Sequence, residues 1–203
     1  MNEPGPSAWN LPNALTVLRF LLVPVFGWLL LADGGHTWGY RIAALAVFVV
    51  AMITDSVDGD IARRRGLVTD FGKVADPIAD KALTGMALVG LSILGVVPWW
   101  VTVLILVREV GVTLVRFLVI RHGVMPAGRG GKLKTLLQTA SLTLLVAPLD
   151  SLPWSQVWFA VAYVLLGLAL VVTVVTGIDY LLQARRLVAG SERTAARRAG
   201  RVR

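Results

Sequence analysis

Two pairs of aspartates stand at helical spacing between Asp55 and Asp80. Asp55 and Asp58 are three residues apart and Asp76 and Asp80 are four apart, so each pair shares one face of a helix. Four carboxylates from two facing helices form an oxygen cage for hard divalent cations, which also take oxygens from a partner such as a diphosphate. Apolar segments flank the stretch, and charges are costly beside lipid, so we interpret it as a functional site.

Small and basic residues complete a longer pattern around these aspartates. Gly59 and Ala62 keep the first face low and let a bulky ligand approach the backbone. Arg63 adds a planar cation suited to phosphate. With Gly72 the spacing reads D-x2-D-G-x2-A-R-x8-G-x3-D-x3-D. The alternative, two ordinary helix ends with solvated carboxylates, does not require Gly, Ala and Gly at set places.

This pattern resembles the signature of the CDP-alcohol phosphatidyltransferase family, with every position present. The resemblance implies two divalent cations, Mg²⁺ or Mn²⁺, which bridge the donor diphosphate and stabilise the leaving phosphate. It further implies that Asp55, Asp58 and Asp76 act mainly as metal ligands. Asp80 would lie nearest the acceptor as general base and could also bind a metal. Spacing alone does not rank the four carboxylates.

The composition predicts an all-α, polytopic membrane bundle. The chain has 203 residues, of which 56% are hydrophobic, and its mean hydropathy is +0.73. Six helices of roughly bilayer-spanning length are expected, the fifth looking short. Their ranges are Leu11–Ala32, Tyr40–Ile61, Lys73–Leu94, Trp99–Ile120, Leu133–Val146 and Ser155–Leu182. We expect an N-terminal arm at 1–10, a transmembrane catalytic domain at 11–184 and a basic cytoplasmic tail at 185–203.

The basic residues predict the orientation. Fifteen of the 20 lie in the second-to-third and fourth-to-fifth connections and the tail, whereas the opposite loops hold only Arg41. The positive-inside rule therefore puts the motif and both termini in the cytoplasm and explains the net charge of +8 without a nucleic-acid partner. No Arg- and Ser-rich transit peptide precedes the first helix, which favours a bacterial inner membrane.

The opening of the first helix carries a second motif, Asn13-Ala-Leu-Thr16-Val-Leu-Arg19. Asn and Thr can hydrogen-bond a nucleotide or a helix end, and Arg can pair with a phosphate. The run resembles the opening of the bacterial phosphatidylglycerophosphate synthases, a subgroup of the family. That resemblance favours binding of CDP-diacylglycerol by Asn13, Thr16 and Arg19, together with Asp58, Gly59, Ala62, Arg63 and Gly72. A helix cap plus an Arg that snorkels to the interface is the alternative.

Charges also interrupt the fourth helix. Arg108, Glu109 and Arg116 should face the bundle interior, where they pair or bind ligand, because lipid cannot solvate them. An internal structural ion pair is the alternative. The R-E-x6-R spacing resembles the same subgroup.

The start of the fifth helix reads Gly131-Lys132-Leu-Lys134-Thr, which again resembles the synthases that use glycerol 3-phosphate. Ordinary positive-inside anchoring explains two lysines equally well. Under the resemblance, Lys132 and Lys134 bind the acceptor phosphate with Arg108 and Arg116, and Lys81 can add to the same pocket.

The resemblance of the combined motifs implies a membrane-bound enzyme that transfers a phosphatidyl group from CDP-diacylglycerol to glycerol 3-phosphate. It also implies a homodimer. Other acceptors remain open within the family: phosphatidylglycerol in cardiolipin synthesis, inositol phosphate or serine. A soluble phosphorylated acceptor fits a basic pocket better than a lipid does. A cation-coupled transporter is disfavoured, since no internal repeat is evident and the carboxylates cluster at one interface. A prenyltransferase would lack the Gly-Ala-Arg spacing.

Overall fold

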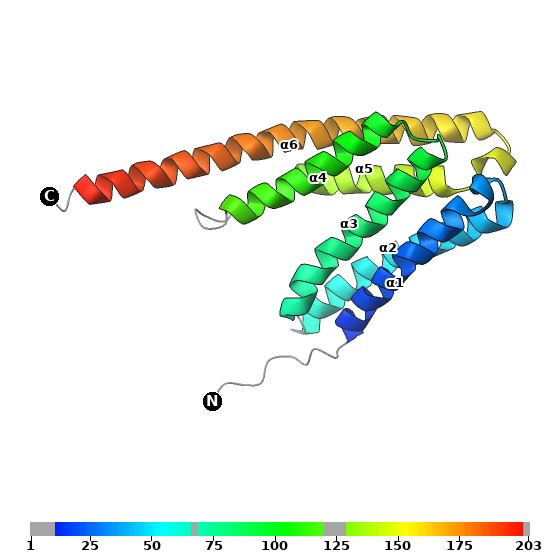
Figure 1. Cartoon of the computed structure of the whole chain (residues 1–203), viewed down its shortest axis with the longest axis horizontal. Helices are drawn as coiled ribbons and strands as arrows, with labels where there is room; N and C mark the ends of the chain where they lie inside the picture. Colours follow the sequence, from blue (N-terminus) through cyan, green and yellow to red (C-terminus); the bar gives the residue numbers. More distant parts are fainter. Residues whose placement is uncertain (1–10, 66–68, 120–128, 201–203) are drawn as a thin grey trace. The chain divides into compact units, whose positions relative to one another are not determined.

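The computed structural model describes residues 11–65, 69–119 and 129–200 (Figure 1). These residues form six α-helices and two short 3-10 helices and contain no β-strand, which confirms the predicted all-α class. The α-helices are α1 (Leu11–Leu31), α2 (Trp38–Arg65), α3 (Asp70–Ile93), α4 (Trp99–Val119), α5 (Arg129–Val146) and α6 (Ser155–Gly200). The 3-10 helices are η1 (Ala32–Gly35) and η2 (Leu149–Ser151).

The last helix is longer than predicted. It continues to Gly200 instead of ending near Leu182, because the Ala- and Arg-rich sequence that follows has high helix propensity and contains no proline. The end of the apolar run therefore marks a change of environment along one helix and not the end of the helix.

Three helices of the described part are long and apolar enough to cross a bilayer. The candidate spans are Asn13–Gly35, Trp38–Asp55 and Ser155–Leu187. The chain is accordingly a membrane protein. Charged residues lower the hydropathy of the other helices: Arg108 and Glu109 interrupt α4, and two lysines lie near the start of the 18-residue α5.

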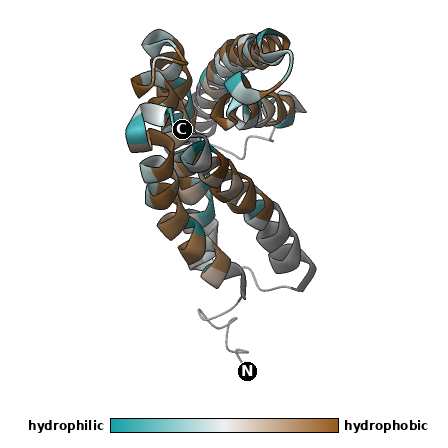
Figure 2. Ribbon diagram, turned by 90° about the vertical axis from the view of Figure 1, so that its right-hand side faces the viewer, coloured by the Kyte–Doolittle hydropathy of each residue, from teal (hydrophilic) through white to brown (hydrophobic). Residues whose placement is uncertain are grey.

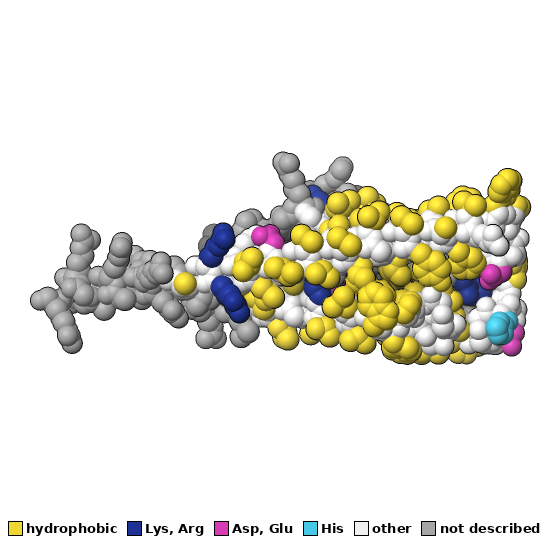
Figure 3. All heavy atoms as spheres, turned by 90° about the horizontal axis from the view of Figure 1, so that it is seen from above, with side chains coloured by type: hydrophobic (Ala, Val, Ile, Leu, Met, Phe, Trp, Pro, Cys, Tyr) yellow, Lys and Arg dark blue, Asp and Glu magenta, His cyan; other side chains and the backbone are white. Residues whose placement is uncertain are grey.

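The outward surface is apolar, as a lipid environment requires. Brown, hydrophobic residues run along most of the helices in Figure 2, and hydrophobic side chains cover much of the described surface in Figure 3. Large side chains such as Trp28, Val107 and Val164 have more than 60% of their surface exposed. An exposed apolar area of this extent marks a surface that does not face water.

The chain divides into two compact units, Met1–Trp99 with Thr139–Ala162, and Trp100–Gln138 with Tyr163–Arg203. In the first unit, α1 packs against α2 and α3. Phe26 of α1 and Phe48 of α2 are fully buried, with ring centroids 5.3 Å apart.

Glycines bring α1 and α3 close together. A Cβ added at Gly27 would lie 2.7 Å from Met86 Sδ, and one added at Gly90 would lie 2.6 Å from Leu30 Cδ2. Neither position has room for a side chain without a shift of its neighbour, so the packing of these two helices depends on both glycines.

Arg41 ties α2 to the end of α5 within the first unit. Its Nε donates to the carbonyl of Val146 at 2.8 Å, and its Nη2 donates to those of Leu145 and Ala147 at 2.8 and 2.9 Å. The last carbonyls of a helix have no partner within the helix, so a cation there satisfies them and favourably meets the helix dipole. Arg41 is 7% exposed and is thus part of the packed unit.

Candidate functional site

One polar face of α1 reaches towards the aspartates of the first unit. Asn13, Thr16 and Arg19 follow one another at intervals of three residues, which places them along one side of the helix. All three are buried. Thr16 Oγ1 donates a 2.5 Å hydrogen bond to Oδ1 of Asp76 on α3.

Arg19 pairs with the first aspartate of the motif. Its Nη1 lies 2.7 Å from Asp55 Oδ1, and its side chain is 0% exposed, whereas that of Asp55 is 34% exposed. A buried guanidinium is tolerated only when it is paired. The α1 polar face (Asn13, Thr16 and Arg19) thus contacts carboxylates from two helices.

Asn13 meets the start of α3. Thr69 caps this helix: its Oγ1 accepts from the backbone N–H of Gly72 at 3.1 Å and donates to Asn13 Oδ1 at 2.8 Å. A Cβ added at Gly72 would lie 3.2 Å from Asn13 Oδ1 and 3.6 Å from Asp76 Oδ2. The glycine of the motif therefore keeps this approach between α1 and α3 open.

Asp80 follows Asp76 one turn later on α3, and both side chains are half-buried. Ala79 and Leu83, which follow Asp76 by three and seven residues, are buried in the core. Lys81 is also half-buried. The side chains of Asp58, Gly59, Ala62, Arg63 and Arg116 lie outside the described residues.

Among the described residues, no group of three or more His, Cys, Asp and Glu side chains is close enough to hold a metal ion. The donor set nevertheless fits a hard divalent cation, because it consists of carboxylates without cysteine or histidine. Arg19 contacts Oδ1 of Asp55, and Thr16 contacts Oδ1 of Asp76. A carboxylate offers two oxygens, so these contacts are compatible with coordination through Oδ2.

A second buried polar cluster joins α4, α5 and α6 in the second unit. Glu109 Oε1 accepts from Arg108 Nη1 at 3.0 Å and from Lys134 Nζ at 2.6 Å. Arg108 also donates from Nε to the carbonyl of Thr173 at 3.2 Å and from Nη2 to Thr176 Oγ1 at 2.7 Å. We call these five residues the polar junction.

The polar junction carries a positive excess, since two cations share one carboxylate. Lys134 is 8% exposed and Glu109 18%. Lys132, two residues before Lys134, is exposed, because two residues turn a helix by about 200°. The predicted pair of acceptor lysines therefore points to different sides of α5. The internal ion pair considered for Glu109 is present, with Arg108 and Lys134 as its described partners.

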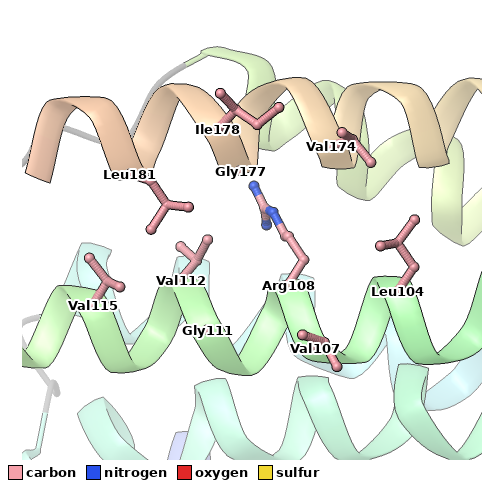
Figure 4. Close-up of a pocket in the computed structure, with 10 residues that line it drawn as sticks. All are labelled: Leu104, Val107, Arg108, Gly111, Val112, Val115, Val174, Gly177, Ile178 and Leu181. Carbon is pink, nitrogen blue, oxygen red and sulfur yellow. The ribbon is translucent and has the colours of Figure 1, made fainter.

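An apolar groove of about 310 Å³ lies between α4 and α6 beside this cluster. Figure 4 shows the Arg108 side chain crossing from α4 towards Gly177 of α6. Gly177 allows this close approach, since an added Cβ would lie 3.2 Å from Arg108 Cγ and the arginine would have to shift. The remaining wall is largely aliphatic, with Gly111 opening it and side chains from Leu104, Val112, Val115, Val174, Ile178 and Leu181.

Sequence reasoning did not single out several residues of these clusters. Thr69 stands directly before the first residue of α3, a helix-capping position. Thr173 and Thr176 are three apart in the long apolar run of α6, a spacing that could have indicated a polar stripe facing Arg108. Gln138 follows Lys134 by four residues and lies on the same buried side of α5.

Comparison with known proteins identifies the family of the chain. A probable phosphatidylglycerophosphate synthase of Mycobacterium tuberculosis is 50% identical over 186 residues, covering 92% of this chain and 87% of the relative. CDP-diacylglycerol–glycerol-3-phosphate 3-phosphatidyltransferases of Bacillus subtilis and Rickettsia typhi are 37% and 39% identical, covering 85% and 84% of this chain and 93% and 94% of the relatives. Residues 9–175 match the family described as CDP-alcohol phosphatidyltransferase. The chain therefore belongs to the CDP-alcohol phosphatidyltransferase family.

Proposed function

We propose that the protein transfers the phosphatidyl group of CDP-diacylglycerol to glycerol 3-phosphate, giving phosphatidylglycerol phosphate and CMP. The observation that carries the proposal is the set of relatives, up to 50% identical over most of both chains, whose names state this reaction or its product. The positive excess of the polar junction supports a phosphorylated acceptor, because a buried cation pair with one carboxylate favours an anion.

The chemistry is a substitution at phosphorus. The acceptor hydroxyl oxygen forms a bond to the lipid-side phosphorus, and the bond between that phosphorus and the CMP oxygen breaks. Asp80 takes the proton of the attacking hydroxyl as general base. Its half-buried position one turn beyond Asp76 keeps it on the aspartate face of α3. CMP leaves with the electron pair of the broken bond.

Asp55, Asp58, Asp76 and Asp80 would hold two divalent cations, Mg²⁺ or Mn²⁺. Bound cations would supply charge neutralisation on the diphosphate and the leaving phosphate. The α1 polar face has a distinct part in this proposal: Thr16 and Arg19 hold Asp76 and Asp55 in place as well as lining the donor site with Asn13 and Gly72.

CDP-diacylglycerol would also contact the four motif residues Asp58, Gly59, Ala62 and Arg63. One of its acyl chains would occupy the aliphatic groove between α4 and α6, which is lined by a candidate membrane-spanning helix and is open at Gly111. Acyl methylenes and aliphatic side chains offer each other the burial that neither obtains from water.

The acceptor phosphate would bind Lys134 and Arg108, with Arg116, Lys132 and Lys81 adding positive charge. Phosphatidylglycerol, inositol phosphate and serine are the competing acceptors within the family. Serine carries a carboxylate but no phosphate, and a lipid acceptor would require a wider apolar cleft.

We further propose six membrane-crossing helices with both termini in the cytoplasm, in a homodimer of the bacterial inner membrane. The clustering of 15 of the 20 basic residues on one side supports this orientation. The catalytic domain would be 11–184, and the basic tail, 185–203, would lie near anionic lipid heads.

The test uses the purified full-length protein in detergent with CDP-diacylglycerol and a panel of acceptors, and follows CMP release. We expect release with glycerol 3-phosphate and not with glycerol or serine. EDTA should abolish it and added Mg²⁺ or Mn²⁺ should restore it. Full turnover in chelator would contradict the metal assignment, and equal turnover with plain glycerol would contradict the phosphate site.

A further inference from the structure

The buried side of α5 carries a polar group that the proposed chemistry has not used. Gln138 is 3% exposed. Its Oε1 has no hydrogen-bond partner among the residues that the structure describes. An amide oxygen in such a place destabilises the folded protein, because it has lost its water without gaining a donor. Buried side-chain acceptors normally have a partner, so an exception calls for a ligand that donates.

The neighbours of Gln138 belong to the polar junction. Lys134 lies four residues earlier, which is one turn of about 5.4 Å along the same side of the helix. Lys134 contacts Glu109, and Arg108 contacts Glu109 and Thr173. Gln138 therefore lies next to the positive excess and not on a separate surface.

Thr173 adds an independent observation of the same kind. It is fully buried, and its Oγ1 has no hydrogen-bond partner in the described part of the chain. Its backbone carbonyl accepts from Arg108. Two buried polar atoms without partners thus belong to residues that adjoin or form one cationic cluster. A cation cluster takes an anion, and the two unpartnered oxygens would take hydroxyl groups attached to it.

We infer that Gln138 Oε1 accepts a hydrogen bond from the hydroxyl group of the acceptor that does not react. This inference rests on the proposed function and deepens it. In glycerol 3-phosphate that hydroxyl stands on the carbon next to the phosphate-bearing carbon. A phosphate on Lys134 would bring it within about one helical turn, the separation of Lys134 and Gln138. Gln138 then selects polyol phosphates over phosphates without a neighbouring hydroxyl.

The experiment compares two acceptors and two enzymes. The acceptors are glycerol 3-phosphate and propane-1,3-diol monophosphate, which keeps the reacting hydroxyl and the phosphate but lacks the middle hydroxyl. The enzymes are the unmodified protein and Gln138→Met, which has similar length and no polar atom. In the unmodified protein, removing the hydroxyl should raise the acceptor KM about 3- to 10-fold, the effect of one neutral hydrogen bond.

In Gln138→Met, the KM for glycerol 3-phosphate should rise by the same factor, and the deoxy acceptor should bind no worse than glycerol 3-phosphate. The donor KM should not change. The melting temperature should rise, because the variant removes a buried group without a partner. Thr139→Val is the matched control: it removes another buried hydroxyl without a partner in the described structure, on the next residue. Its acceptor KM should equal that of the unmodified protein.

The two levels of the proposal fail differently. No CMP release with any phosphorylated acceptor would overturn the proposed function. The role of Gln138 alone would be overturned if CMP is released with glycerol 3-phosphate but the missing hydroxyl raises the acceptor KM equally in both enzymes. A lower melting temperature with unchanged acceptor KM in Gln138→Met would show that Gln138 bonds a neighbouring chain or lipid, and would also overturn it.

Discussion

The aspartates around Arg19 in the first unit and the polar junction in the second are both partly buried clusters of charge. The first has an excess of negative charge and the second an excess of positive charge. Arg19 is completely buried against Asp55 in a region that carries further aspartates. In the polar junction the numbers are reversed, since Arg108 and Lys134 share Glu109. In each cluster, one side chain of the less frequent charge pairs with side chains of the more frequent charge. Under the proposed function, we expect the sign of the excess charge to decide the ligand, a cation in one unit and an anion in the other.

The two clusters also differ in how far their charged side chains are exposed. Asp55 keeps about a third of its side chain accessible, while its arginine partner has none. In the junction, the Lys134 cation and its carboxylate partner are both mostly buried. Because burial strengthens electrostatic interactions, the junction should be the less tolerant of a lost charge on either side, whereas Asp55 can still be solvated. Mutations of both clusters can test this contrast.

Asp80→Asn should have the largest effect, because it removes the proposed base while leaving the cationic cluster intact. General base catalysis contributes about 10²- to 10⁴-fold, so CMP release should fall by that factor. Binding of CDP-diacylglycerol should persist, whereas Asp55→Asn should weaken it as well. Rates and donor binding are measured on both, with Asp179→Asn, an exposed carboxylate of α6, as the control. Equal loss of donor binding in the two variants would argue against a dedicated base.

Arg19→Gln should chiefly destabilise the first unit. Breaking a buried ion pair costs about 3–5 kcal/mol, and the partial exposure of Asp55 puts the expected cost near 3 kcal/mol. A loss of that size lowers the melting temperature by about 6–12 °C in a chain of this length. Thermal unfolding of Arg19→Gln and of the double variant with Asp55→Asn tests this, and the double variant should recover part of the loss. If Arg19 served only the donor, the donor KM would rise and the melting temperature would stay unchanged.

Lys134→Gln should raise the acceptor KM by about 10- to 150-fold, the effect of losing a charge-assisted hydrogen bond of about 1.5–3 kcal/mol. Lys132→Gln is the matched control two residues away and should have a smaller effect, because its side chain is exposed. Acceptor KM and melting temperature are measured for both.

The double variant Lys134→Gln/Glu109→Gln separates binding from stability in this comparison. It removes the carboxylate that Lys134 leaves behind, so it should regain stability without regaining acceptor affinity. A purely structural role for Lys134 predicts a lower melting temperature with an unchanged acceptor KM in the single variant.

Gly111→Leu should have the smallest effect and should act on the donor alone. An added Cβ at Gly111 meets no atom within 4 Å, so the leucine can enter the groove without displacing the helix. Loss of one or two buried methylenes of an acyl chain, at about 0.8 kcal/mol each, raises the donor KM about 4- to 15-fold. Gly167→Leu is the control, since Gly167 on α6 is equally unobstructed but does not line the groove. An acceptor KM that changed instead would remove the acyl chain from the groove.

The helices were largely predictable because their signals are local. Long apolar runs, charge clusters and turn residues placed α1 and α4 within about one residue of their observed ends. A partly helical basic tail was predicted after Leu182, but not that it continues α6 without a break to Gly200, because hydropathy reports the membrane and not helix continuity. Six α-helices were expected and six are present in the described part of the chain, where three of them are long and apolar enough to cross a bilayer.

The residues of the candidate site were predictable as a set, but their contacts were not. Asn13, Thr16 and Arg19 are separated from their partners by 36 to 60 residues, so the choice between donor binding and bracing of Asp55 and Asp76 depended on packing. Lys132 and Lys134 look equivalent in sequence, and only the helical phase separates them. Gln138 was missed because an amide in an apolar helix carries no charge to attract notice.

The Arg41 cap has a consequence for the order in which the chain is made. Its acceptors, the carbonyls of residues 145–147, follow Arg41 by 104 to 106 positions. When α2 has left the ribosome, the carbonyls that will hold this guanidinium have not yet been synthesised. Arg41 must therefore remain without these acceptors while α3 and α4 are synthesised, and it can bind them only when the end of α5 has been made. The contact that stabilises the finished unit can therefore form only after α5 has been made.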